Sequence, residues 1–124
     1  MNKQGEAYIL ESIFNTEHLI NEREWQPLRD GVDISVIYDQ GAGHSRAAFL
    51  RYQAGASVPK HVHTGFEHIL ILHGSQGDGT QLFTPGMLVI HGPGTSHAIS
   101  SPSGCLALAI WEKPVQFLTS SAHS

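Results

Sequence analysis

The sequence predicts an all-β fold, an antiparallel sandwich or barrel, on three observations. From Trp25 onward, short apolar runs of about four to eight residues recur roughly every ten residues. The chain holds 13 glycines and 6 prolines, and clusters of them separate these runs. No part of this region keeps a helical apolar period of about 3.6 residues. Short strands joined by glycine- and proline-containing turns are typical of β-sandwiches and β-barrels.

Each predicted strand follows from one of these runs. VDISVIY alternates and is rich in β-branched residues, RAAFLRY alternates again after the loop DQGAGH, and HILIL is a dense apolar segment. QLF, MLVIH and CLALAIW follow, and the turn segments GSQGDGT, PG, GPG and SPSG separate them. The predicted strands are therefore residues 32–38, 46–52, 68–72, 81–83, 87–91 and 105–111.

Residues 1–24 form an N-terminal extension with weaker patterning. Ile9, Ile13 and Phe14 have some helical spacing, and Asn15 or Thr16 could cap a short helical turn. The 124 residues are the length of one domain, so we expect residues 1–124 to form a single domain. Its barrel core is expected at about 25–113 and a polar tail at 119–124.

The composition excludes several classes of protein. With 40% hydrophobic and 15% charged residues the chain is globular, and it lacks the roughly 18-residue apolar stretch of a membrane-spanning helix. A net charge of −4 without a basic run argues against nucleic acid as a partner. No secretory signal is visible, and the single Cys105 cannot form an intramolecular disulfide, so we expect a cytoplasmic protein. Cys105 opens an apolar segment and is expected to be a small buried residue.

Histidine is the anomaly in the composition, with nine copies. Residues i and i+2 of a strand face the same side, so His61 and His63 present both imidazoles together. Glu67 begins the next predicted strand, and His97 follows the turn GPGTS. Three imidazoles and a carboxylate that converge inside a barrel would bind a first-row divalent metal and leave coordination positions open. Ligand type alone does not choose among Fe, Zn, Mn and Ni.

The glycines around this cluster separate it from an ordinary surface pattern. An isolated H-x-H pair is more often not a ligand pair, and a surface position without a role is the default for His18, His44 and His123. Here Gly55 and Gly74 complete the string G-x5-H-x-H-x3-E-x6-G, which needs many independent matches. The spacing therefore favours a functional site.

This string resembles the first motif of the cupin superfamily. The second cupin motif, G-x5-P-x-G-x2-H, is met by Gly86, Gly94 and His97, although Gly92 stands where that motif has proline and Pro93 is displaced by one. The resemblance implies a double-stranded β-helix, the small jelly-roll barrel of cupins.

Residues 46–74 and 94–105 are similar to the cupin domain of ChrR-type anti-sigma factors and its stand-alone relatives. The resemblance extends over roughly residues 25–113 and implies one divalent metal ion. Carried over position by position, the metal ligands of the family are His61, His63, Glu67 and His97. His68 stands where relatives commonly have a second glutamate, so we assign it no role.

Further residues have predicted places around the metal. His73 shares the parity of Glu67, and His91 precedes the GPG turn, so both are candidates for proton transfer. Tyr52 and Trp111 are expected to be core aromatics rather than pocket residues. By parity, the aliphatic wall of the site would consist of Ile69, Ile71, Val89 and Ile99.

We expect a small metal-dependent enzyme, dioxygenase-like or with other Lewis-acid chemistry, that acts on a small oxygenated molecule. The alternative is a non-catalytic, ChrR-like sensing or regulatory cupin that binds metal or a small ligand. ChrR-type factors hold the sigma factor through an N-terminal zinc-binding helical domain. About 25 residues precede the barrel here and they contain no cysteine, so we do not expect direct sigma-factor binding. The segments 68–72 and 105–111 are apolar on both faces, so we expect a homodimer in which a partner covers part of them.

Overall fold

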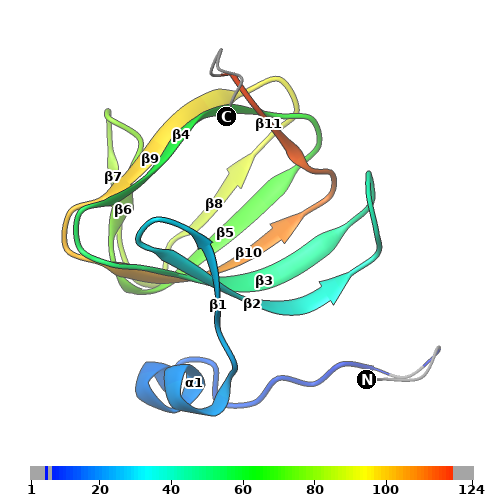
Figure 1. Ribbon diagram of the computed structural model, residues 1–124, viewed down its shortest axis with the longest axis vertical. Coiled ribbons are helices and arrows are strands. Elements are labelled where there is room, and N and C mark those ends of the chain that lie inside the picture. The colour runs from blue at the N-terminus through cyan, green and yellow to red at the C-terminus, as the bar shows by residue number, and fades with distance from the viewer. Residues whose placement is uncertain (1–4, 6, 119–124) are drawn as a thin grey trace.

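The computed structural model describes residue 5 and residues 7–118, which form two antiparallel sheets that face each other (Figure 1). One sheet has the strand order β1-β2-β3-β10-β5-β8, and the other has the order β11-β4-β9-β6-β7. The elements are α1 (Thr16–Glu22), β1 (Gln26–Arg29), β2 (Val32–Asp39), β3 (Arg46–Tyr52), β4 (Ala56–His63), β5 (Glu67–Gly74), β6 (Gln76–Gly77), β7 (Leu82–Phe83), β8 (Leu88–His91), β9 (Ser96–Ser101), β10 (Cys105–Trp111) and β11 (Val115–Phe117). The all-β prediction and the jelly-roll barrel implied by the cupin resemblance are confirmed.

The predicted strands match β2, β3, β5, β7, β8 and β10 to within a few residues at each end. The short strands β1, β6 and β11, of two to four residues, had no separate prediction. Strands β4 and β9 were expected only as the segments that carry His61, His63 and His97, without bounds. Glycine explains one close packing of two turns. Gly74 has a φ of +73°, and a Cβ there would meet the carbonyl oxygen of Gly104. Only glycine allows the end of β5 to approach the turn before β10 so closely.

The main core lies between the two sheets and follows the alternation of the strands. Ala48 and Leu50 of β3 and Ala107 and Ala109 of β10 are buried there. The residues between them face the opposite side of the six-stranded sheet, where Phe49 forms part of a second buried cluster.

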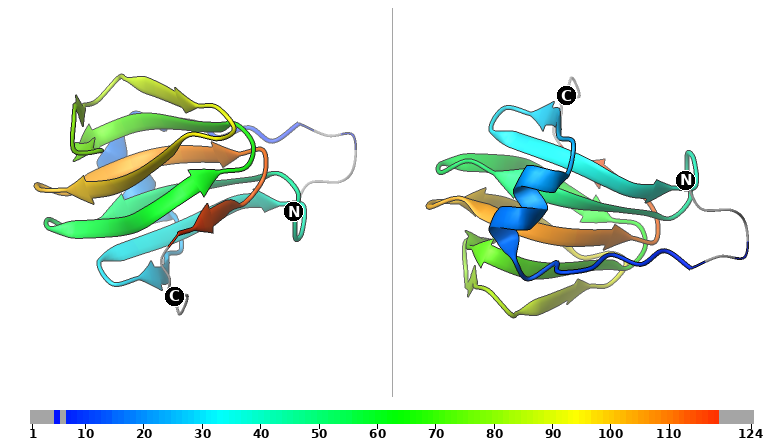
Figure 2. Two further views of the ribbon diagram at one scale, coloured as in Figure 1. Left: turned by 90° about the horizontal axis from the view of Figure 1, so that it is seen from above. Right: turned by 90° about the horizontal axis from the view of Figure 1, so that it is seen from below.

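Helix α1 lies across that outer face (Figure 2). Leu19, which is 5% exposed, packs with Phe49, Leu72 and Leu106, and the partly buried Trp25 joins the same cluster. The sequence predicted that a partner subunit would cover apolar surface of β5 and β10. The chain covers this region with its own N-terminal helix, which removes that argument for a dimer.

The structure confirms Asn15 as the N-cap of a short helix, but Ile9, Ile13 and Phe14, whose spacing suggested a helix, all precede α1. The Oδ1 atom of Asn15 accepts a hydrogen bond from the backbone N–H of His18 at 3.2 Å. At the other end, Arg23 donates to the hydroxyl of Ser35 at 2.6 Å, which ties the helix to β2. In the described part of the chain, no helix has the length and apolarity needed to cross a membrane.

Candidate metal centre and ligand cavity

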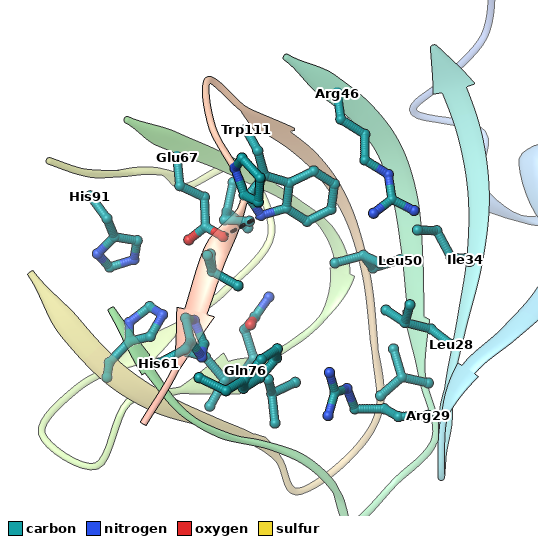
Figure 3. A pocket seen from close by; sticks show the side chains of 18 of the residues that line it. Leu28, Arg29, Ile34, Arg46, Leu50, His61, Glu67, Gln76, His91 and Trp111 are labelled. Carbon is teal, nitrogen blue, oxygen red and sulfur yellow. Dashed lines mark hydrogen bonds between the residues drawn. The ribbon is translucent and has the colours of Figure 1, made fainter. Parts of the chain in front are cut away.

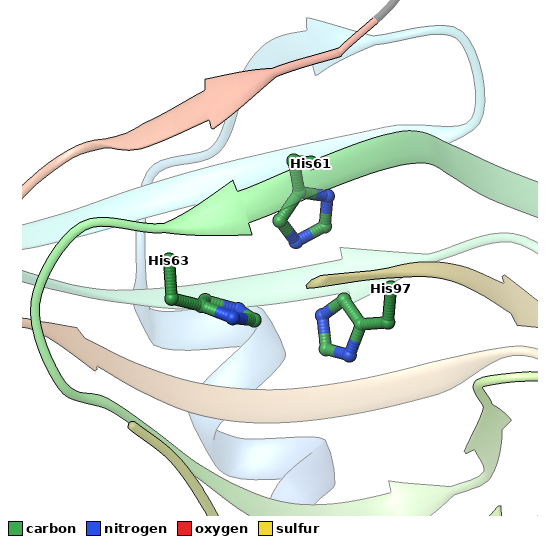
Figure 4. A group of neighbouring side chains, drawn as sticks. All are labelled: His61, His63 and His97. Carbon is green, nitrogen blue, oxygen red and sulfur yellow. The ribbon is translucent and has the colours of Figure 1, made fainter. Parts of the chain in front are cut away.

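Strands β4 and β9 bring three of the predicted histidines together (Figure 4). His61 and His63 lie on β4, and His61 is paired in register with His97 on β9. The ring centroids of His61 and His63 each lie 4.7 Å from that of His97. One nitrogen from each ring falls within 4.8 Å of the others, a spacing at which the three imidazoles could hold one ion.

Hydrogen bonds to carbonyl groups determine which ring nitrogens carry a proton. The Nδ1 atom of His61 lies 2.8 Å from the carbonyl oxygen of Pro59, and the Nδ1 atom of His63 lies 3.0 Å from that of Thr95. A carbonyl only accepts, so each Nδ1 atom carries the proton and donates. The Nε2 atom of each neutral ring is then left with its lone pair inside the site.

Glu67 shows that this site suits a cation. Its Oε1 atom lies 2.9 Å from the Nε2 atom of His63, and the two side chains are 8% and 1% exposed. A carboxylate and the unprotonated nitrogen of a neutral imidazole are both acceptors, so they need a proton or a metal ion between them. The other oxygen, Oε2, accepts a hydrogen bond from the indole N–H of Trp111 at 2.6 Å. The donor set therefore fits a divalent metal, and Trp111 holds the carboxylate that would be one of its ligands.

Burial keeps most of the imidazoles in their metal-binding, neutral form. Burial lowers the pKa of His61, and burial together with the neighbouring imidazoles lowers the pKa of His97 to about 4. Burial acts in the same direction on His63, but the Glu67 carboxylate outweighs it and raises the pKa of that imidazole. Burial alone would raise the pKa of Glu67, but the hydrogen bonds from His63 and Trp111 lower it.

His91, a weak candidate from the sequence, lies in the same cluster. Strand β8 pairs it with Glu67. Its ring stacks on that of His63 at a centroid distance of 4.8 Å and lies 4.3 Å from that of His97. Glu67, His91 and His97 form a second group of side chains close enough to share an ion. His91 is therefore placed to act as a further ligand of an ion in this cluster or to carry a proton beside it.

His73 does not reach the site, because β5 contains an irregularity that the sequence pattern did not reveal. His73 lies opposite Leu106 and Ile71 lies opposite Ala107, which leaves Leu72 as an extra residue in the strand. The bulge breaks the alternation on which the assignment of His73 rested, and the side chain is exposed.

The remaining histidines also lie outside the cluster. His68 contacts the ring of Phe66 at 6.4 Å and does not contribute to the site. His18 is exposed on α1, and His44 is exposed in the β2–β3 loop at the edge of the cavity described next. His123 lies outside the described residues.

A cavity of about 360 Å³ opens beside His61, Glu67, His91 and His97 (Figure 3). Its walls include the predicted aliphatic residues Ile69, Val89 and Ile99. Ile71 is instead fully buried in the core and does not line the cavity.

Tyr52 and Trp111 pack on the core, as predicted. Both also line the cavity, so the expectation that they are core residues rather than pocket residues is corrected. Cys105 is 5% exposed in the core, and burial raises the pKa of its thiol to about 12. The prediction that Cys105 is a small buried residue is confirmed.

Two arginines line the cavity that sequence reasoning did not single out. Arg29 ends β1 and Arg46 begins β3. Neither lies in a cupin motif, and a single arginine in a strand carries no signal of its own. Their place in the site depends on how β1 and β3 pair with β2, which is a long-range property of the fold.

Solved structures of known proteins have the same fold. An acetylacetone dioxygenase from Acinetobacter johnsonii superposes with a TM-score of 0.75 at 16% identity, over 98% of this chain and 83% of that chain. A cupin protein from Ralstonia eutropha superposes with a TM-score of 0.71 at 21% identity, over 82% of this chain and 70% of that chain. At these identities the likeness shows the fold alone.

ChrR of Cereibacter sphaeroides, an anti-sigma-E factor, is 29% identical over 100 residues, which are 79% of this chain and 46% of ChrR. The solved complex of Rhodobacter sphaeroides SigE with the anti-sigma ChrR matches with a TM-score of 0.65 at 28% identity, over 74% of this chain and 50% of that chain. The chain thus spans about half the length of ChrR.

The complex contradicts our expectation about sigma factors. We argued against direct binding from the few residues before the barrel, but a ChrR protein with this domain is seen bound to SigE. The match covers only half of ChrR, so the length of one segment of this chain is no argument about the partners of such proteins. The expectation is withdrawn.

The sequence profile of the ChrR cupin-like domain matches residues 15–115, which is most of the chain. This match includes all four predicted metal ligands and both cupin motifs. The chain therefore belongs to the ChrR cupin-like domain family.

Proposed function

We propose that this barrel binds one divalent metal ion through His61, His63, Glu67 and His97 and uses it to hold a small oxygenated molecule in the adjoining cavity. The observation that carries the proposal is the 2.9 Å approach of the His63 Nε2 atom to the Glu67 carboxylate. The Nδ1 proton of His63 is engaged by Thr95, so this pair of buried acceptors needs a second proton or a metal ion between them, and a metal ion also satisfies the neighbouring His61 and His97.

The residues of the chain have separate tasks in this proposal. Thr95 and Pro59 fix the histidine tautomers, and Trp111 holds the carboxylate in place. When bound, the metal supplies Lewis-acid polarisation of a ligand oxygen, or oxygen chemistry if it is iron. The aliphatic wall keeps bulk water away, and the half-buried His91 can take up a proton from the bound molecule.

For the reaction at this metal site, we propose dioxygenase-like or other Lewis-acid chemistry. The open volume of about 360 Å³ beside the histidines supports catalysis on a small molecule, because a purely structural metal would be enclosed by its ligands. The fold shared with an acetylacetone dioxygenase is compatible with this reading.

A regulatory role is the second candidate, and family membership favours it. The ChrR proteins that match this chain are anti-sigma factors, and one is seen in complex with SigE. In this reading the same metal and cavity report a small ligand to a protein partner, and turnover is absent.

Metal binding is tested by the His97→Gln variant, with His73→Gln as the matched control. His97 is only partly buried and belongs to the site, whereas His73 is exposed and lies outside it. We expect elemental analysis to find stoichiometric metal in the wild type and in His73→Gln, and a loss of roughly 100-fold in affinity in His97→Gln. Equal metal affinity in all three proteins would contradict the ligand assignment.

The two candidate functions are separated by metal reconstitution. The metal-free chain is loaded with Fe(II), Mn(II), Ni(II) or Zn(II) and mixed with small dicarbonyl compounds under air. Oxygen uptake or product formation that depends on one metal supports the enzyme. Silence under every metal, together with binding of a sigma factor to the loaded chain, supports the regulator.

Two further predictions remain untested. A homodimer now depends on exposed apolar residues of the edge strand β8, where Leu88 and Ile90 are 58% and 54% exposed. A cytoplasmic location rests on the single, buried Cys105.

A further inference from the structure

We propose that Arg29 is the anchor for a carboxylate at the far end of the cavity, so that the ligand is a small amphipathic carboxylic acid. This inference rests on the proposed use of the cavity as a ligand site and adds the chemical class of the ligand. Figure 3 shows Arg29 entering the cavity from the side of β1, across from His61 and His91.

Among the described residues, the guanidinium of Arg29 contacts an aromatic ring but has no carboxylate partner. No carboxylate of these residues lies within ion-pair distance of its guanidinium, and no hydrogen bond joins its side chain to another described residue. Its Nε atom is buried without a partner. A buried donor without an acceptor is costly, and a ligand carboxylate would supply one acceptor with the geometry that a guanidinium prefers.

Arg29 differs from Arg46 and Arg51 in having no described carboxylate beside it. The Nε atom of Arg46 is also buried without a hydrogen-bond acceptor, but it lies 3.7 Å from the carboxylate of Asp39, and Arg51 lies 3.2 Å from Asp33. Arg29 is therefore the positive group of the cavity with the greatest need for an anion. Since Arg29 is the cavity arginine without a described carboxylate neighbour, its one uncompensated charge suits a monoanionic carboxylate better than a phosphate, which carries up to two charges.

The local structure aims Arg29 at the cavity. In the β1–β2 ladder Pro27 lies opposite Asp33 and Arg29 lies opposite Val32, so Leu28 is an extra residue. Neighbouring residues of a regular strand point to opposite faces, but this bulge lets both Leu28 and Arg29 line the cavity. Leu28 then provides apolar wall directly beside the charged group.

Phe117 connects this end of the cavity to the metal end. The guanidinium of Arg29 lies 4.8 Å from the ring centroid of Phe117, whose ring lies 5.6 Å from that of His61. The straight-line distance from the ring centroid of His61 to the guanidinium of Arg29 therefore cannot exceed the sum of these two distances. A carboxylic acid with a chain of about four to eight carbons can span it, with its carboxylate on Arg29 and its other end beside the histidines.

The test compares hexanoate with hexanamide, which has the same chain and a similar shape but no charge. Both are titrated calorimetrically into the 124-residue chain, with metal removed and with Zn(II) added. We expect the wild type to prefer hexanoate by roughly tenfold or more, since a hydrogen bond to a charged group is the main difference between the two probes. Arg29→Gln should lose this preference while binding hexanamide as before.

Three further variants make the result decisive. Arg51→Gln removes a charge outside the cavity and should keep the preference for hexanoate. Arg29→Lys should keep part of this preference, and it replaces Arg29→Gln in the test if circular dichroism shows that Arg29→Gln is unfolded. An unchanged preference in Arg29→Gln, its loss in Arg46→Gln alone, or no binding of hexanoate at millimolar concentration would overturn the proposal. If the chain binds no metal but its preference for hexanoate depends on Arg29, only the proposed metal function is refuted. If the chain binds metal but shows no preference for hexanoate, only the role of Arg29 as an anchor is refuted.

Discussion

The Trp111→Phe variant tests the link between the aromatic wall and the metal ligands. Phenylalanine keeps an aromatic ring at this position but removes the N–H that donates to the Oε2 atom of Glu67 at 2.6 Å. Glu67 is 6% exposed, and phenylalanine supplies no other donor to its Oε2 atom. A hydrogen bond to a charged group contributes about 1.5–3 kcal/mol, and we expect the metal-free variant to lose about that much stability at neutral pH.

The pH dependence separates the hydrogen bond from packing. The indole N–H helps to lower the pKa of Glu67 below its ordinary value of 4.5, so its stabilising effect is complete above that pH and is lost as the carboxylate protonates. The difference in stability between wild type and Trp111→Phe should therefore shrink as the pH falls below 4.5. Urea denaturation of the metal-free proteins at several pH values measures it.

Trp25→Phe is the matched control. The indole of Trp25 donates to a neutral acceptor, the carbonyl oxygen of Ile20, at 3.0 Å. Its loss should cost about 0.5–1.5 kcal/mol with no dependence on pH in this range and no effect on metal affinity. In Trp111→Phe, metal affinity should fall roughly 10- to 100-fold, because the indole orients a ligand. Unchanged stability and metal affinity in Trp111→Phe would refute the role that we give to this contact.

Two further predictions concern the fold and its response to pH. Leu19→Ala should lower the free energy of unfolding by about 2–4 kcal/mol. Ile9→Ala, at a position that is 77% exposed, should change it by less than about 0.5 kcal/mol. Equal effects of the two variants in urea denaturation would show that α1 is not anchored as described. The metal-free chain should lose stability as the pH falls from 6.5 toward 4, because the pKa of His97 is lowered to about 4 in the fold and the neutral imidazole is favoured there. His97→Gln should flatten this part of the stability curve, and an unchanged curve would contradict the assigned shift.

The predicted metal cluster could be found from the sequence because its geometry is mostly local. A separation of two residues on one strand is enough to bring His61 and His63 to the same face. A short turn then leads to Glu67 at the start of the next strand. His97 came from a second motif with its own glycines, and the pairing of β4 with β9 places it beside His61. Such short-range relations are visible in a single sequence.

What the sequence could not predict depends on irregular strand pairing. The extra residue Leu72 turns His73 away from the site, and the extra residue Leu28 turns Arg29 into it. A bulge reverses the parity of every residue after it, and alternation alone does not reveal where one occurs. The cover that α1 provides through Leu19 was missed for a related reason, because the outer face of a sheet can be buried by any segment of the chain.

The two ends of the cavity differ in how tightly the fold constrains them. At the metal end, His63 is 1% exposed and contacts Thr95 and Glu67, so replacing it disturbs several buried groups at once. At the other end, Arg29 belongs to an edge strand that pairs only with β2, and its side chain has no hydrogen-bonding partner among the described residues. A substitution there removes little that holds the barrel together. Under the proposed function, substitutions in β1 would change the choice of ligand without disturbing the histidine cluster, and one barrel could then serve either catalysis or sensing.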